Sequence, residues 1–178
     1  TDTLGMVLIF ALYLITMLSI LGGKLPNYFI NKGMNPYAGR MRAMLIFAFF
    51  PLAGLLAQPL GDKFGTPWFP IILIGILGAA HQSWSANIYS TVSDMFPKSV
   101  VATVTGIGGM AGGLGSALIN GVSGALFTYA DETQMQLLGF VGKPAGYMVI
   151  FSFCAVAYLI GWCIMKTLVP KYKPIVVE

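Results

Sequence analysis

The densest run of hydrogen-bonding side chains in this sequence of 178 residues extends from His81 to Asp94 and contains its only histidine. A histidine can exchange a proton near neutral pH. Gln, Asn, Ser, Trp and Tyr side chains can bind a polar solute through hydrogen bonds and flat apolar rings. The run directly continues an apolar segment, residues 71–80. Because polar groups inside an apolar segment are costly unless protein or water satisfies them, the run indicates a functional site.

Helical periodicity, at about 100° per residue, divides the run into two faces. The first face carries His81, Gln82, Ser85, Tyr89 and Ser93. The second face carries Ser83, Trp84, Asn87, Thr91 and Asp94. A helix that is polar on both sides cannot face lipid. It must therefore stand between other helices, with at least one face lining a water-filled cavity.

Two interpretations of these side chains stay open. Ser, Thr and Asn often hydrogen-bond across helices, so the serines taken singly are typical of helix packing. The set taken together favours a solute-binding wall. Its candidates for substrate binding are first Gln82, Ser85 and Tyr89, and then Trp84 and Asn87.

The two titratable ends of the run are interpreted separately. His81 is a candidate proton relay or, equally, a neutral member of a helix interface. Asp94 is expected to form an ion pair with Lys98, because both lie where the helix leaves the membrane.

Composition indicates that membrane-spanning helices position these residues. Mean hydropathy is +0.80, and charged residues make up 9% of the chain, against roughly 25% in soluble domains. A helix needs about 20 apolar residues to cross a bilayer. The sequence therefore predicts an all-α, polytopic membrane protein with one transmembrane domain, residues 1–178. Its five spans are expected at about 3–21, 43–60, 67–96, 100–129 and 147–169.

Details of the spans follow from Gly and Pro. The first span is expected to end at Gly22–Gly23, and Pro51 and Pro59 are expected to bend the second. The connection 130–146 has room for a turn of interfacial helix. Thr1 precedes an apolar run without the basic segment of a signal peptide, so we expect the chain to be part of a larger protein.

The basic residues are distributed unequally between the two sides of the predicted spans. One side holds Lys24, Lys32, Arg40, Arg42, Lys98, Lys166, Lys171 and Lys173. The other holds Lys63 and Lys143. This distribution predicts a cytoplasmic C-terminus by the positive-inside rule. The net charge of +4 is therefore explained by the orientation of the spans in the membrane, and it does not indicate nucleic-acid binding.

A glycine-rich stretch, residues 106–117, lies in the fourth predicted span. Gly108 and Gly112 form one GxxxG spacing, and Gly109 and Gly113 form a second. Such spacings let two helices approach closely in lipid, and glycine also permits bending. These four residues are therefore predicted to act in helix packing or as a hinge.

No catalytic or metal-binding set is visible in the sequence. One histidine and six acidic residues at ends and loops offer no nucleophile with its base, and Cys154 and Cys163 lie nine residues apart in one apolar run. We expect no enzyme, no metal and no cofactor. No ring of like charges or carbonyl filter supports a channel either.

Several stretches resemble the hexuronate transporters of the anion:cation symporter family, which belongs to the major facilitator superfamily. They are residues 81–87, 92–98 and 106–112, with the tail residues 168–171 in agreement. In addition, residues 22–42 are similar to the superfamily's cytoplasmic loop motif. The motif residues are Gly23, Arg40 and Arg42, with Asn27 at the usually acidic position.

The resemblance implies that the spans are helices eight to twelve of twelve, forming part of the C-terminal six-helix bundle. It implies a symporter that moves a hexuronate, such as glucuronate or galacturonate, with protons across the cytoplasmic (inner) membrane by alternating access. The partners would be the organic anion, protons, the lipid bilayer and the missing N-terminal half, which would supply the charged groups. The alternatives are a symporter for another organic anion, such as an aldonate or sialic acid, and a non-transporting membrane scaffold.

Overall fold

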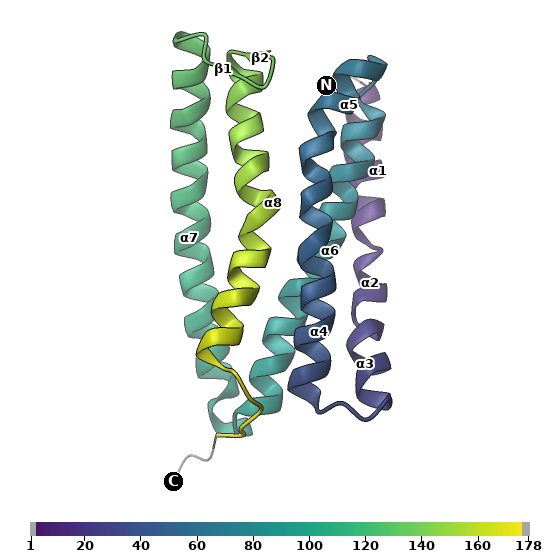
Figure 1. The fold of residues 1–178 in the computed structure, drawn as a ribbon, viewed down its shortest axis with the longest axis vertical. Helices are drawn as coiled ribbons and strands as arrows, with labels where there is room; N and C mark the ends of the chain where they lie inside the picture. The colour runs from purple at the N-terminus through teal and green to yellow at the C-terminus, as the bar shows by residue number, and fades with distance from the viewer. Residues whose placement is uncertain (1–2, 176–178) are drawn as a thin grey trace.

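The computed structural model describes residues 3–175, and its long segments are helical (Figure 1). Five segments are long and apolar enough to cross a membrane, which confirms the predicted all-α, polytopic membrane fold. They are Thr3–Asn31, Pro36–Phe64, Trp68–Met95, Lys98–Glu132 and Lys143–Leu168.

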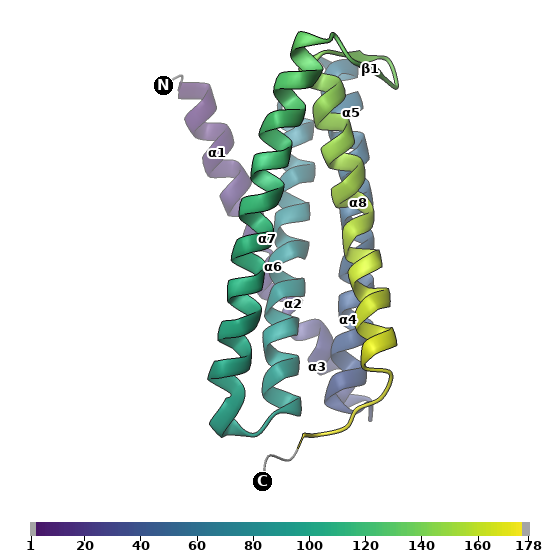
Figure 2. The ribbon, with the colours of Figure 1, turned by 90° about the vertical axis from the view of Figure 1, so that its left-hand side faces the viewer.

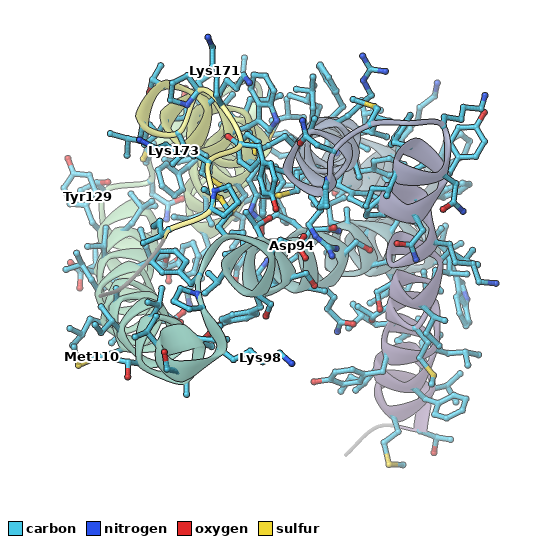
Figure 3. All side chains as sticks on the ribbon, turned by 90° about the horizontal axis from the view of Figure 1, so that it is seen from below. Asp94, Lys98, Met110, Tyr129, Lys171 and Lys173 are labelled. Atoms are coloured by element: carbon cyan, nitrogen blue, oxygen red, sulfur yellow. The ribbon has the colours of Figure 1, made fainter. Side chains whose placement is uncertain are left out.

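The third segment, helix α6 (Trp68–Met95), is the centre of the arrangement. It packs against the first and second segments, whereas α7 (Lys98–Glu132) packs mainly on α8 (Lys143–Leu168). Seen along the bundle, α6 lies between α7 and the first segment (Figure 3). Ala130 is the only buried residue of α7, so this helix is exposed along nearly its whole length.

The first segment is interrupted twice. It consists of α1 (Thr3–Thr16), α2 (Ser19–Gly22) and α3 (Lys24–Asn31), and α1 diverges from the other helices toward the N-terminus (Figure 2). Helix α2 ends at Gly22, where the sequence predicts the end of the first span, but the segment long enough to cross a membrane extends to Asn31. Gly23 adopts right-handed helical angles, φ −71° and ψ −22°, so the chain continues into α3.

The second segment changes helix type beside Pro51. Helix α4 (Pro36–Phe49) is followed by a 3₁₀ segment, η1 (Phe50–Leu56), and by α5 (Ala57–Phe64). Pro51 is the second residue of η1, and because it has no N–H it cannot donate the hydrogen bond that would continue α4. Pro59 does not interrupt α5, because it lies in the first turn of this helix, where the backbone N–H needs no partner within the helix.

The remaining helices lie within a few residues of the predicted spans, but the connection before α8 differs. It contains a short β-hairpin with strands of two residues each, β1 (Gln136–Leu137) and β2 (Phe140–Val141), which pair antiparallel. This hairpin occupies the connection that has room for a turn of interfacial helix. Leu138 and Gly139, which join the strands, both have positive φ values. This conformation matches the twist of a tight hairpin, which explains the β structure.

Glycines bring the first segment into close contact with α6. A Cβ atom built on Gly22 would lie 1.9 Å from the Ser83 hydroxyl oxygen. On α6 itself, a Cβ on Gly75 would lie 2.8 Å from Ile15, and one on Gly78 would lie 2.6 Å from Thr16. Three glycines thus remove the side-chain volume that would separate the two segments.

An apolar core lies between α4, α6 and α8 toward the end of the molecule that carries the C-terminus. Its buried residues include Tyr37, Met41, Met44 and Trp84. Polar groups at its edge are paired across helices, since the Trp162 indole N–H donates to the Met41 carbonyl oxygen at 2.8 Å. This core fixes the rotation of α6 about its own axis and therefore decides which of its faces is open.

We predict that Gly22→Ala destabilises the protein by about 1–3 kcal/mol, the usual effect of overpacking, because the added methyl group overlaps Ser83. Gly5→Ala on α1 is the matched control, since a Cβ there meets no described atom within 4 Å. The measurement is the midpoint of thermal unfolding of the full-length protein in detergent. Equal midpoints for the two variants would contradict the close approach.

Candidate functional site

The buried face of α6 satisfies its own polar groups. The Ser83 hydroxyl donates to the Ala79 carbonyl oxygen at 2.8 Å. The Asn87 side-chain amide donates to the Ser83 carbonyl oxygen, and the Thr91 hydroxyl donates to the Asn87 carbonyl oxygen, both also at 2.8 Å. Each donor lies four residues after its acceptor, so the three bonds form a ladder along one helix face. Asn87 and Thr91 therefore need no partner helix, whereas the Ser83 hydroxyl also lies 3.4 Å from the Ser19 carbonyl oxygen of α2.

The opposite face of α6 is open. His81, Gln82, Tyr89 and Ser93 are exposed, and Ser85 is half-buried. Ser83, Trp84, Asn87 and Thr91 are buried. The structure thus confirms the division into two faces that helical periodicity predicts.

Gln82 is bonded to the first segment. The Ser19 hydroxyl donates to the Gln82 side-chain oxygen at 2.8 Å. Ser19 is the first residue of α2, directly after the interruption at residues 17–18. A shallow cavity of about 280 Å³ adjoins Gln82 and is lined by Tyr13, Thr16 and Met17 among others. Because its oxygen is occupied by Ser19, Gln82 has its amide N–H groups available for another acceptor.

His81 is bonded to the last helix. Its Nδ1 atom forms a hydrogen bond with the Tyr158 hydroxyl on α8. The Tyr158 ring also meets Trp84 edge-on, with ring centroids 5.4 Å apart. Sequence reasoning missed Tyr158, although a tyrosine in the middle of an apolar span is itself a signal, because its hydroxyl needs a partner there.

A larger cavity lies beside His81 and Tyr158, between α6, α7 and α8. Its volume is about 450 Å³, within the roughly 300–1,000 Å³ of small-molecule sites. Gly112, Gly115 and Ser116 of α7 contribute a wall without large side chains. The open face of α6 is therefore bordered by hydrogen-bonded polar pairs on both sides.

The five residues predicted to bind substrate do not all share this face. Gln82, Ser85 and Tyr89 do. Trp84 is 6% exposed and belongs to the apolar core, although it also lines the larger cavity. Asn87 is 2% exposed and lies on the packing face. The binding role of all five stays a prediction.

The four glycines predicted for packing or hinging lie on α7, where they make no close contact. A Cβ on Gly108, Gly109, Gly112 or Gly113 would meet no described atom within 4 Å. Helix α7 is assigned as one continuous helix through this stretch. Close approaches occur at other glycines, among them Gly22, Gly75 and Gly78 between the first segment and α6, and Gly146 of α8 against Ala130 of α7. The role of the four α7 glycines stays a prediction.

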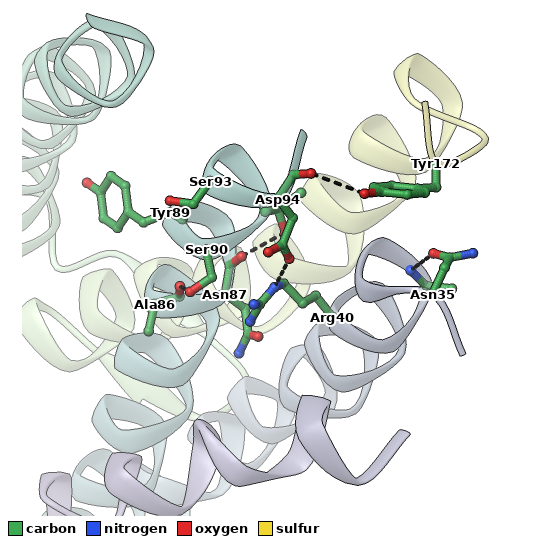
Figure 4. A network of polar contacts seen from close by, with 11 residues as sticks. Asn35, Arg40, Ala86, Asn87, Tyr89, Ser90, Ser93, Asp94 and Tyr172 are labelled. Carbon is green, nitrogen blue, oxygen red and sulfur yellow. Dashed lines mark hydrogen bonds and ion pairs between the residues drawn. The ribbon is translucent and has the colours of Figure 1, made fainter. Parts of the chain in front are cut away.

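The residues of the predicted loop motif lie at the end of the bundle that holds the C-terminus. The Arg40 Nε atom lies 2.5 Å from the Asp94 Oδ2 atom, an ion pair that joins α4 to α6 (Figure 4). The prediction that Asp94 forms an ion pair with Lys98 was wrong. Lys98 lies apart from Asp94 (Figure 3), because the chain turns at Phe96–Pro97 before α7 begins.

The other loop-motif residues take no part in this ion pair. Gly23 and Asn27 are exposed. The Arg42 guanidinium lies 5.6 Å from the centre of the Phe29 ring, a cation–π contact between α4 and α3. The α3–α4 and α6–α7 connections and the C-terminal segment all lie at the lower end in Figure 1. The structure thus brings the basic connecting segments to one end, as topology predicts.

The open polar face of α6, with a cavity on each side, suits the binding of a polar solute. Among residues 3–175, no group of three His, Cys, Asp or Glu side chains could hold a metal ion. Five apolar helices with a polar open face define an integral membrane protein.

Comparison with known proteins relates this integral membrane protein to transporters. The chain is 30% identical over 148 residues to the hexuronate transporter of Escherichia coli strain K12, and equally to that of Escherichia coli O157:H7. The aligned region covers 83% of this chain and 31% of each relative, so the chain spans about a third of the length of the curated relatives it matches. No family model matches the chain, and no solved structure matches it. The chain is thus homologous to part of a transporter, which is not an enzyme, in agreement with the sequence prediction.

We predict a coupling energy of about 1–2 kcal/mol between Arg40 and Asp94 in a double-mutant cycle of alanine variants. Their side chains are 18% and 22% exposed. The pair therefore falls between exposed pairs, at about 0.2–1 kcal/mol, and fully buried pairs, at about 3–5 kcal/mol. The unfolding free energy of the full-length protein is the measurement. A cycle of Lys98→Ala with Asp94→Ala is the control, and a larger coupling there would contradict the assignment.

Proposed function

We propose that the chain is the C-terminal part of a major facilitator transporter that carries a hexuronate together with protons across the cytoplasmic membrane. The observation that carries this proposal is the open polar face of α6 in a chain homologous to part of a hexuronate transporter. His81 lies near the midpoint of α6, where solute sites of alternating-access transporters are found. In this proposal the five spans are helices eight to twelve, and the C-terminus is cytoplasmic.

The open face suits the hydroxyl groups of a sugar acid. Gln82 offers N–H donors, Ser85 offers a hydroxyl, and the Tyr89 ring is 43% exposed. None of these side chains carries a positive charge. In our proposal the carboxylate is therefore bound by a basic residue of the N-terminal half, while this chain binds the sugar ring.

The pair of His81 and Tyr158 is our candidate for proton transfer. A histidine beside a cavity can take up a proton from water and release it there, while the Tyr158 hydroxyl holds the imidazole in place through its Nδ1 atom. Among the described residues of the spans, no carboxylate lies on the open face of α6. His81 is therefore the titratable group that this chain can offer there, and proton-coupling acids would come from the N-terminal half.

The scaffold alternative relies on polar residues that join helices. Asn87 and Thr91 donate only to carbonyl oxygens of α6 itself. His81, Gln82 and Ser83 are hydrogen-bonded to other helices, so uptake and counterflow must separate the scaffold from the transporter. A related organic anion, such as an aldonate or sialic acid, stays open, because hydroxyl-binding groups alone do not define the carboxylate-bearing solute.

We predict that Gln82→Ala lowers hexuronate uptake by the full-length protein in proteoliposomes about tenfold, since a hydrogen bond to a charged or polar solute contributes roughly 1–3 kcal/mol. Ser90→Ala is the matched control, because the Ser90 hydroxyl donates to the Ala86 carbonyl oxygen of its own helix. Counterflow with each candidate anion identifies the substrate. Absence of counterflow with every anion would support the scaffold.

Replacement of Ser19 tests how Gln82 is positioned. Ser19→Ala removes the hydrogen bond that fixes the Gln82 oxygen, so we expect the apparent KM for hexuronate to rise severalfold. Ser19→Thr retains a hydroxyl and should restore most of the affinity. In a Gln82→Ala background, Ser19→Ala should have little further effect. Additive effects of the two changes would contradict positioning of one residue by the other.

The proton role of His81 makes a different prediction. His81→Gln retains hydrogen bonding but cannot titrate, so counterflow should persist while accumulation driven by a pH gradient is lost. Tyr158→Phe should reduce accumulation in the same way, because it removes the hydroxyl bonded to His81. If accumulation in His81→Gln equals that of the unchanged protein, His81 is only a structural member of the interface.

A further inference from the structure

A third cavity lies at the basic end of the molecule, away from the open face of α6. It is an open cavity bordered by the start of α4, the last turn of α8 and the C-terminal segment, and its volume is about 370 Å³. Its lining includes Asn35, Tyr37, Lys166, Lys171 and Tyr172. Neither the solute-binding proposal nor the relatives' name assigns a function to it.

The charge of this cavity is positive. Lys166 and Lys171 line it, and no acidic residue is among its described lining residues. The Lys166 ammonium group donates to the Pro170 carbonyl oxygen at 2.9 Å and lies 5.7 Å from the centre of the Tyr37 ring. These contacts hold the ammonium group at the cavity. An ammonium group has three N–H donors, so two remain for an anion.

The position of the cavity relates it to the edge of a bilayer. Helix α4 begins at Pro36 and α8 ends at Leu168, so both spans reach the water boundary beside it. Tyr37 and Tyr172 have the amphipathic rings that are enriched at this depth. Basic pockets between transmembrane helices at such a boundary suit anionic lipid headgroups.

We propose that this cavity binds the headgroup of an anionic phospholipid, with Lys166 and Lys171 contacting its phosphate. The C-terminal segment that forms one wall is also bonded to the end of α6. The Tyr172 hydroxyl donates to the Asp94 carbonyl oxygen at 3.3 Å, and the Ile175 N–H donates to that of Met95 at 2.7 Å. A lipid seated here joins α4, α8 and this segment, and thereby stabilises the end of α6.

The test is a titration of the delipidated full-length protein in detergent with phosphatidylglycerol, read by native mass spectrometry and by thermal unfolding. We expect one tightly bound lipid and a raised unfolding midpoint. The double variant Lys166→Gln and Lys171→Gln should weaken this binding about tenfold or more, because two basic groups that attract the headgroup are lost. The variant Lys166→Arg and Lys171→Arg keeps both charges and should retain the lipid.

Matched controls separate a site from general attraction. Lys173→Gln removes a charge from the same segment, but Lys173 is not among the cavity's lining residues. Equal weakening by Lys173→Gln, or equal binding of phosphatidylcholine, would overturn the proposal. Displacement of the lipid by millimolar inorganic phosphate would assign the cavity to free phosphate and would also overturn it. None of these results depends on hexuronate uptake.

Discussion

The structure depends on one constraint, which is that α6 must carry a polar face through the interior of an apolar bundle. Helix α6 meets it with donors that return to carbonyl oxygens of the preceding turn, from Ser83, Asn87 and Thr91. An unpaired polar group in a membrane interior costs several kcal/mol. Because these groups are paired within α6, the helix can pack against apolar neighbours on this face and leave its other polar face open.

Close packing of the first segment follows from the same arrangement. Ser83 is both the start of the ladder and the residue that Gly22 meets, so a small residue is needed on each side of the contact. This approach brings Ser19 beside Gln82 and orients the amide. Helix packing and the geometry of the open face are thus parts of one contact between α2 and α6.

The sequence predicts much of this structure because most of its signals are periodic. Hydropathy located the five spans, and the 100° rotation per residue separated the exposed Gln82 from the buried Asn87. Contacts between distant segments were harder to predict. Asp94 is paired with Arg40, 54 residues away, whereas Lys98 is near only in sequence. For the same reason, no local pattern indicates that Gly22 contacts α6 while the GxxxG glycines of α7 contact nothing described.

The open face of α6 lacks a positively charged side chain, so a binding site for an anion must obtain that charge from another part of the protein. The side chains there are neutral hydrogen-bonding groups and one histidine. The basic residues, in contrast, gather at the ends of the spans, where Arg40 is already paired with Asp94. An anion desolvated in a membrane needs a cationic partner, since neutral donors alone compensate only part of the lost hydration. In our proposal this face therefore recognises the solute's shape and hydroxyl groups, while the N-terminal half supplies the charge. Such a division leaves transport dependent on both halves meeting at the same solute.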